Sequence, residues 1–78
     1  MNATTLRIRA RVCLRQELPA PDQRRAIREA AGLSQGEVAD AIGVTRQAVG
    51  HWEAGTRTPK GALLERYVSA IRTMREAS

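Results

Sequence analysis

Residues 35 to 54 constrain the fold of this 78-residue chain more than any other segment, because they combine two short helical patterns with a tight turn. The apolar positions of each pattern fall on one helical face: Val38, Ala39 and Ile42 in the first, then Val49 and Trp52 in the second. Gly43 stands between them, where the backbone needs a positive φ that glycine adopts without steric cost. The small Ala39 lets the helices touch, and Val44 is expected to enter their shared core. The segment predicts a helix, a turn and a second helix.

Capping residues predict the limits of both helices. Ser34 is a good N-cap for the first helix, and Glu37 three residues later completes a capping box. Thr45 caps the second helix, which is expected to run from Arg46 to about Glu53. A helix of about two turns is stable only when its apolar face packs on neighbours. Its opposite face is then left exposed.

That exposed face carries side chains able to hydrogen-bond base edges. Arg46 suits guanine and Gln47 suits adenine, in each case through paired hydrogen bonds. His51 lies one turn beyond Gln47, where it can reach a base or a phosphate, and Gly50 has no side chain to obstruct close approach. A metal site at His51 is not expected, because the chain has a single histidine and the single cysteine Cys13. No cofactor is predicted.

Together these features resemble the Xre family, which includes Cro and the phage repressors. Three runs carry the resemblance over residues 21 to 59: Arg28-Glu-Ala-Ala-Gly-Leu-Ser-Gln35, the helix-turn-helix itself, and Trp52-Glu-Ala-Gly-Thr-Arg-Thr-Pro59. The resemblance implies an all-α fold of the lambda repressor-like type, a small bundle of four or five helices. It also implies that the second helix of the motif reads DNA in the major groove.

The resemblance implies further roles around the motif. In the family, a Gln at the position of Gln35 binds a phosphate and braces the first residue of the reading helix, which is Arg46 here. Thr45 is expected to serve both as cap and as phosphate ligand. Arg57 and Lys60, in the following loop and at the head of the next helix, are additional phosphate candidates.

Two other residues are assigned to the structure. Its spacing with Val49 places Trp52 on the buried face, which favours core packing over stacking on a base. In the family, the Glu at the position of Glu53 pairs with an arginine on the preceding helix, and Arg28 occupies that position. The resemblance therefore implies a structural ion pair, whose loss is expensive when the pair is partly buried.

The first twenty residues form an N-terminal extension to a domain expected over residues 21 to 78. Within it, residues 4 to 18 fit two patterns. Leu6, Ile8, Ala10 and Val12 alternate with arginines as in a strand, whereas Leu6, Ala10, Cys13, Leu14 and Leu18 share one helical face. A helix is favoured, because Ala, Leu and Arg are good helix formers and Thr4 or Thr5 can cap it.

Two helices complete the predicted bundle. Pro21 suits the first turn of a helix that runs to Ala31 and stops at Gly32. After a loop over residues 56 to 59, apolar residues at helical spacing predict a last helix of some fifteen residues: Leu63, Leu64, Tyr67, Val68, Ile71 and Met74. Leu64, Tyr67 and Val68 are assigned to the core, and Ile71 and Met74 are expected to be available to a partner.

The charge favours a polyanionic partner. Twelve arginines and one lysine give a net charge of +5 and a pI of about 11.0. The charge is uneven, at +4 over residues 1 to 32, −1 over residues 33 to 59 and +2 over residues 60 to 78. Phosphate attraction must therefore come from the flanks, where four arginines form an auxiliary reserve: Arg7, Arg9, Arg11 and Arg15. An arginine-rich composition from a GC-rich genome explains these residues equally well.

The chain shows neither an apolar run of membrane-spanning length nor a signal peptide, and its lone cysteine suits a reducing compartment, so a cytoplasmic protein is predicted. The expected function is a non-enzymatic, sequence-specific regulator of transcription of the phage or bacterial type, which binds a palindromic double-stranded DNA operator as a homodimer. Two alternatives stay open. One is an antitoxin that binds a toxin through residues 1 to 18 or the C-terminal helix and its own promoter through the helix-turn-helix. The other is a protein-interaction adaptor that keeps the fold without binding DNA.

Overall fold

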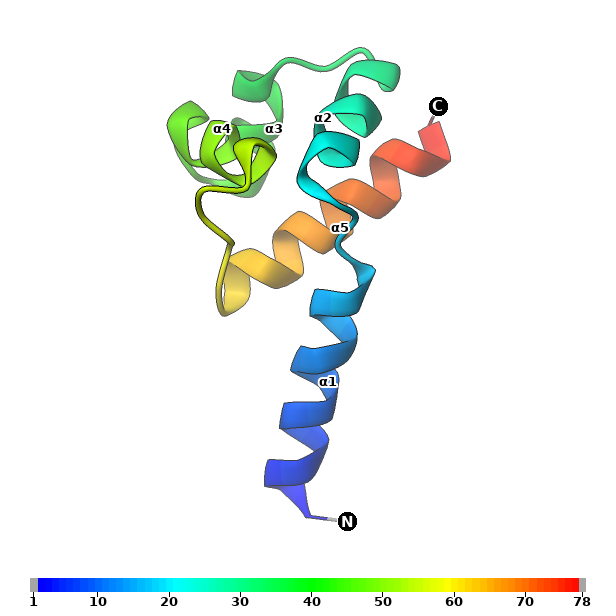
Figure 1. Cartoon of the computed structure of the whole chain (residues 1–78), viewed down its shortest axis with the longest axis vertical. Coiled ribbons are helices and arrows are strands. Elements are labelled where there is room, and N and C mark those ends of the chain that lie inside the picture. Colours follow the sequence, from blue (N-terminus) through cyan, green and yellow to red (C-terminus); the bar gives the residue numbers. More distant parts are fainter. Residues whose placement is uncertain (1, 78) are drawn as a thin grey trace.

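The computed structural model describes residues 2–77, which form five helices and no strand (Figure 1). The helices are α1 (Ala3–Glu17), α2 (Pro21–Ala30), α3 (Gln35–Ile42), α4 (Arg46–Ala54) and α5 (Ala62–Ala77). The predicted all-α fold of the lambda repressor-like type is confirmed. Residues 4 to 17 are helical, so the strand pattern of the N-terminal extension was the wrong one of its two interpretations.

Helices α2 to α5 form a compact body, and α1 projects from it as a stalk (Figure 1). The molecule accordingly measures 42 × 24 × 20 Å along its principal axes. The main contact of α1 is with α5, and none of its residues is buried. The body therefore holds the core, and the stalk adds little to it.

The core lies between α3, α4 and α5. Its buried apolar side chains are Val38, Ala39, Ile42, Val49, Trp52, Leu64, Tyr67, Val68, Ile71 and Met74. The rings of Trp52 and Tyr67 pack with their centroids 4.7 Å apart and their planes tilted by 46°, a separation at which aromatic pairs attract. Burial raises the pKa of Tyr67 to about 12, so this residue stays neutral in the core. The cluster fixes one face of α4 against α5 and leaves the other face free.

The prediction that Ile71 and Met74 are available to a partner is wrong. They are only 2% and 5% exposed. The reason is the length of α5, which packs against both α2 and α3 and therefore buries its apolar stripe as far as Met74. Any partner of α5 must therefore bind mainly through the more exposed residues of this helix.

The ends of the motif helices follow their capping signals. Both hydrogen bonds of the Ser34 and Glu37 capping box are present, and Gly43 ends α3 with a φ of 91°. The Thr45 hydroxyl accepts from the amide of Ala48 at 3.2 Å. Gly55 ends α4 with a φ of 76°, and a Cβ there would lie 2.9 Å from Cγ of Pro21. Conformation and space both require glycine at this position.

Helices α1 and α5 do not begin at the residues that the sequence indicated. Asn2 caps α1 by accepting from the amide of Thr5 at 2.9 Å, in place of Thr4 or Thr5. Helix α5 begins at Ala62, so Lys60 lies in the loop before it. Gly61, with a φ of 57°, separates the two.

Candidate nucleic-acid interface

The free face of α4 presents three exposed polar side chains along one strip. Arg46 and Gln47 stand in the first turn, and His51 follows one turn after Gln47. Val49 and Trp52 point the opposite way, into the core. Because the buried face is fixed by packing, the exposed strip is held in a defined orientation.

A shallow recess connects this strip to the start of α3. Gln35, the first residue of α3, lines it together with Arg46, Gln47, Gly50 and His51. A Cβ on Gly50 would lie 3.8 Å from the amide group of Gln35, which is ordinary contact. The absence of a side chain at Gly50 therefore keeps this recess open without being required by the protein's own packing.

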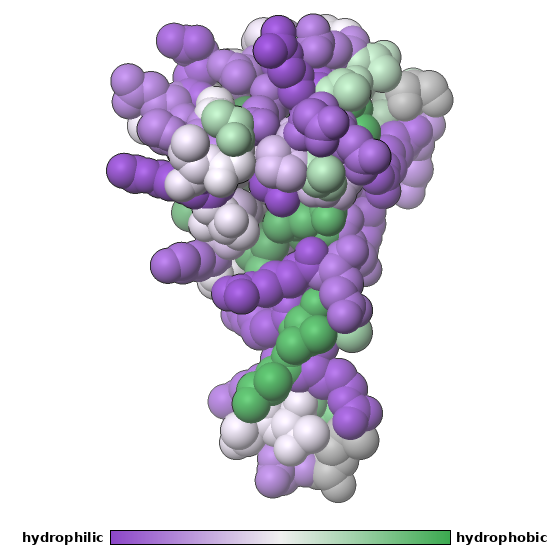
Figure 2. All heavy atoms as spheres, viewed as in Figure 1, coloured by the Kyte–Doolittle hydropathy of each residue, from purple (hydrophilic) through white to green (hydrophobic). Residues whose placement is uncertain are grey.

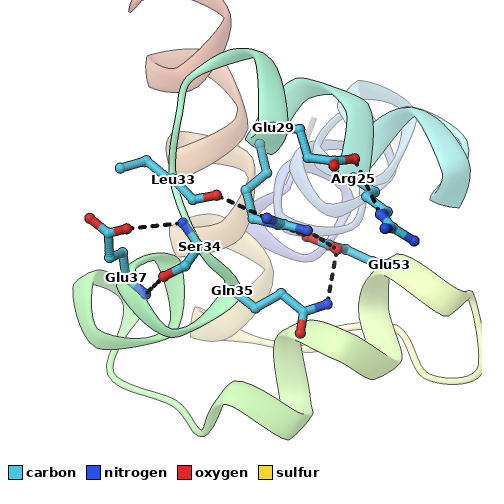
Figure 3. Close-up of polar contacts among 8 residues, drawn as sticks. Arg25, Glu29, Leu33, Ser34, Gln35, Glu37 and Glu53 are labelled. Atoms are coloured by element: carbon cyan, nitrogen blue, oxygen red, sulfur yellow. Dashed lines mark hydrogen bonds and ion pairs between the residues drawn. The ribbon is translucent and has the colours of Figure 1, made fainter.

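The predicted brace between Gln35 and Arg46 is absent from the part of the chain that the structure describes. Nε2 of Gln35 instead donates to Oε1 of Glu53 at 3.1 Å (Figure 3). The amide of Gln35 is thus bound to a buried carboxylate near the end of α4. One hydrogen of the Gln35 amide remains free for another acceptor.

A second recess lies on the other side of the strip. Thr45 and the two loop cations Arg57 and Lys60 line it, together with Gln47 and His51, which line both recesses. The two recesses thus form one surface, which we call the reading face: Gln35, Thr45, Arg46, Gln47, Gly50, His51, Arg57 and Lys60. All the residues predicted to contact DNA, except the N-terminal arginines, meet on it.

The Thr56 hydroxyl holds the His51 ring from one side. It donates to the main-chain carbonyl of His51 at 3.3 Å, and it lies 3.1 Å from Nδ1 of the ring. This contact leaves Nε2 to another molecule. Nε2 accepts a hydrogen bond when the ring hydrogen is on Nδ1 and donates one when the hydrogen is on Nε2, so it can serve a base edge or a phosphate.

An ion pair between Arg28 of α2 and Glu53 of α4 fixes α4 on its buried side. Nε and Nη2 of Arg28 donate to Oε2 and Oε1 of Glu53 at 2.6 and 3.0 Å, and the two side chains are only 11% and 5% exposed. Nη1 of Arg28 also donates to the carbonyl of Leu33 at 2.9 Å. With Gln35, the Glu53 carboxylate joins α2, α3 and α4 (Figure 3).

Both members of this pair are stabilised in their charged forms. Burial alone would raise the pKa of Glu53, but the hydrogen bonds from Arg28 and Gln35 outweigh it and hold the pKa below its usual value. The hydrogen bond with Glu53 raises the pKa of Arg28. The orientation of α4 therefore depends on a carboxylate that stays ionised near neutral pH.

Two arginines that the motif did not indicate also position the motif helices. Buried Arg24 donates from Nε to the carbonyl of Pro19 and from Nη1 to the carbonyl of Trp52, both at 2.9 Å. Arg66 donates to the carbonyl of Ile42 at 3.3 Å. A cation is favourable at the carbonyl end of a helix. The only sequence signal for Arg24 is its spacing of four residues from Arg28, on the same face of α2.

The structure does not bring the auxiliary arginines to the reading face. Arg7, Arg9 and Arg15 are exposed on the stalk, which projects below α5, whereas α4 lies above α5 (Figure 1). Arg11 donates to the carbonyl of Gly61 at 3.1 Å and lies 3.8 Å from Glu65. Among residues 2–77, Arg11 therefore links the stalk to the loop that carries Arg57 and Lys60, through the carbonyl of Gly61.

In residues 2–77 no helix is long and apolar enough to cross a membrane, and no three His, Cys, Asp or Glu side chains are grouped as metal ligands. Searches of curated proteins and of solved structures gave no match. A helix-turn-helix family model, however, matches residues 25–74, more than half of the chain. This match covers α3, α4, nearly all of α5 and most of α2, and it supports a DNA-binding regulator. The chain belongs to the helix-turn-helix family of the Xre and lambda repressor-like type.

Proposed function

We propose that this protein is a sequence-specific regulator of transcription that reads double-stranded operator DNA in the major groove with α4. The observation that supports this most directly is the reading face. It places hydrogen-bonding side chains on the exposed side of a helix whose opposite side is fixed by the core and by the Glu53 carboxylate. An α-helix fits the major groove, where each base pair presents a distinct pattern of donors and acceptors.

Each side chain of the exposed strip has a suitable base partner. Arg46 can donate two hydrogen bonds to O6 and N7 of guanine, and Gln47 can pair with N6 and N7 of adenine. His51, whose Nδ1 lies 3.1 Å from the Thr56 hydroxyl, can use Nε2 to bond a base edge. Gly50 allows the bases to approach the backbone of α4 closely.

The phosphate contacts lie on both sides of this strip. Gln35 and Thr45 stand at the N-termini of α3 and α4, where amide groups and the helix dipole favour anions. Gln35 keeps one amide hydrogen for a phosphate oxygen, and Arg28 neutralises the nearby Glu53 carboxylate. Arg57 and Lys60 supply positive charge from the loop on the opposite side. Such contacts orient the protein, and the strip on α4 selects the sequence.

The regulator acts as a homodimer on a palindromic operator, in a bacterial or phage-infected cell. One helix of nine residues reaches only a few base pairs. A second copy doubles the length of sequence that is read, and its two-fold symmetry matches a palindromic site. Half-sites one helical turn apart, about 34 Å, present their major grooves on the same face of the DNA. Occupying the operator blocks or redirects the polymerase.

The test is selection of binding sites from a randomised double-stranded DNA library. Wild-type protein is expected to enrich one sequence with two-fold symmetry. The matched control is the Arg46→Ala, Gln47→Ala double variant, which keeps the core and the phosphate contacts. A wild type that enriches nothing beyond this control contradicts the proposal.

A further inference from the structure

The stalk formed by α1 exposes apolar side chains that the body does not cover. Leu6, Ile8 and Val12 are 54%, 60% and 47% exposed and are the exposed large hydrophobic residues of residues 2–77. Figure 2 shows apolar surface along the stalk, among hydrophilic side chains. Burial of such side chains is favourable, so the stalk is suited to contact another surface.

The uncovered face of α1 is defined by the face that is already used. Arg11 and Glu17 bind Gly61 and Arg72 of the α5 region, and Leu14 between them is half-buried. On the opposite side of the helix, Ile8 and Val12 are four residues apart and lie together. Thr5 and Arg9 lie beside them around a shallow notch. We call this surface the α1 stripe.

A groove of about 480 Å³ lies between α3 and α5. Its apolar lining consists of Leu33, Val38, Ala41, Ile42, Ala70 and Met74. Ala41, Ser69 and Thr73 are small, so the backbone of a helix can approach closely. Glu37 and Glu65 lie at the groove, and its one cation, Arg66, is bound to the carbonyl of Ile42. The groove is therefore apolar at its floor and acidic at its edge.

The α1 helix of the same chain does not enter this groove. It lies along the other flank of α5, where Glu17, Leu18 and Pro19 meet Val68 and Arg72. The buried guanidinium of Arg24 holds the carbonyl of Pro19, which fixes the turn between α1 and α2. No segment of residues 2–77 fills the groove, which leaves it open to a second molecule.

We propose that the α1 stripe of one copy docks in the α3–α5 groove of a second copy, and that the exchange is reciprocal. Charge complementarity supports this choice, because the stripe carries Arg9 and the groove carries the exposed carboxylate of Glu37. The second groove carboxylate, Glu65, lies 3.8 Å from Arg11 of its own chain. Pairing α1 with α1 would instead bring together eight arginines, four from each copy, and its one acidic residue, Glu17, is already paired with Arg72. The inference deepens the proposed homodimer and rests on it.

Reciprocity also supplies the contact area that a stable dimer needs. Stable interfaces bury about 1,600 Å² in total, which is more than a single short helix provides. Two exchanged helices double the buried surface and close a two-fold dimer. None of the residues that line the groove belongs to the reading face, so both copies remain free to contact DNA.

The first experiment is sedimentation of the full chain without DNA. Ile8→Asp is expected to weaken the dimer by about tenfold or more, because docking would bury an unpaired carboxylate. Ala10→Asp is the matched control, since it adds the same charge at an exposed position away from the α1 stripe and should leave the dimer unchanged. Circular dichroism checks that α1 stays helical in both variants. Equal dimerisation of Ile8→Asp and wild type would overturn the proposal.

The second experiment tests the groove. Thr73→Arg, at an exposed position of α5, should block it and weaken the dimer. The two variants are then mixed. Thr73→Arg keeps an intact α1 stripe and Ile8→Asp keeps an intact groove, so a heterodimer can form one of the two contacts. This heterodimer should be more stable than the homodimer of either variant. Pairing through α1 alone would leave Thr73→Arg unaffected, and that result would overturn the docking site.

DNA reading is measured separately. The Ile8→Asp protein keeps its reading face and is expected to bind an isolated half-site as the wild type does. If Ile8→Asp and Thr73→Arg both dimerise like the wild type while half-site binding persists, the helix exchange is overturned and the proposed function is not. Loss of half-site binding in Arg46→Ala tests only the proposed function.

Discussion

Helices α4 and α1 show how little the length of a helix says about its role. Helix α4 has nine residues, and its apolar face, both ends and its Glu53 side chain are all tied to neighbours. Helix α1 has fifteen residues and no buried side chain. Short helices are unstable alone, so the order of α4 comes from its contacts and not from its own propensity. The contacts of the body thus fix the short helix α4, whereas the longer helix α1 stays exposed along its length.

The arginines divide in the same way. Arg24, Arg28 and Arg66 donate to carbonyls or to Glu53 within the body. Arg7, Arg9 and Arg15 extend from the stalk into solvent. Composition gives only the total positive charge of these arginines. The structure distinguishes arginines that position helices from arginines that are exposed to other molecules.

The largest expected effect comes from removing the ion pair that fixes α4. Glu53→Ala leaves the buried Arg28 guanidinium without its partner and should destabilise the domain by about 3 kcal/mol. Glu29→Ala is the matched control, because it removes the exposed pair with Arg25 (3.2 Å), which is worth at most about 0.5 kcal/mol (Figure 3). Chemical denaturation measures both. Equal stability of the two variants would show that the ion pair does not hold α4.

The same pair makes stability depend on pH. The pKa of Glu53 is lowered in the folded protein, so its contribution is complete above the unfolded value of 4.5 and is lost as the pH falls through the lower, folded value. Thermal unfolding between pH 7 and pH 3 should show a loss of stability that is smaller in Glu53→Gln. An identical acid limb in this variant would assign the loss to other carboxylates.

The exposed side of α4 should behave in the opposite way, with a large effect on binding and none on the fold. Arg46→Ala or Gln47→Ala is expected to cost about 1 to 3 kcal/mol in binding to the selected operator. Binding to scrambled DNA should change little, and the melting temperature should not change. Equal losses on both DNAs would mean that these residues contact only phosphates.

A smaller effect sharpens the contrast between the loop and the stalk. Each cation that neutralises a phosphate contributes about 0.9 to the slope of log affinity against log salt concentration. Arg57→Gln with Lys60→Gln should therefore lower the slope by about 2 per monomer. The matched double variant Arg7→Gln with Arg15→Gln, on the stalk, should leave it nearly unchanged. A reduced slope in the stalk variant would show that Arg7 and Arg15 contact phosphates, as the charge distribution suggested.

The smallest expected effect separates stability from binding at one position. Gly50→Ala places a methyl group 3.8 Å from Gln35, without a clash, and should stabilise α4 by about 0.5 to 1 kcal/mol. If bases approach the backbone at Gly50, the same methyl group should weaken operator binding. A variant that is more stable and binds equally well would remove Gly50 from the reading face.

These contrasts also explain which parts of the structure were predictable. Ser34, Gly43 and Thr45 act on their immediate neighbours, so local sequence rules were sufficient to place the motif. The burial of Ile71 and Met74 depends on how far α5 packs against α2 and α3. The apolar pattern of α5 alone does not indicate the extent of this packing. Arg24 binds carbonyls that are distant in sequence or outside any pattern, so its role was visible only in three dimensions.

The two hydrogen bonds of Arg24 have a consequence for the DNA that this protein can recognise. One planar guanidinium holds the carbonyl of Pro19, where the stalk leaves the body, and the carbonyl of Trp52, in the last turn of α4. If two copies are joined through their stalks, these hydrogen bonds fix the distance between the two α4 helices before the protein binds DNA. One base pair inserted between the half-sites turns one of them by about a tenth of a turn. Such an operator should bind poorly even though every contacted base is retained.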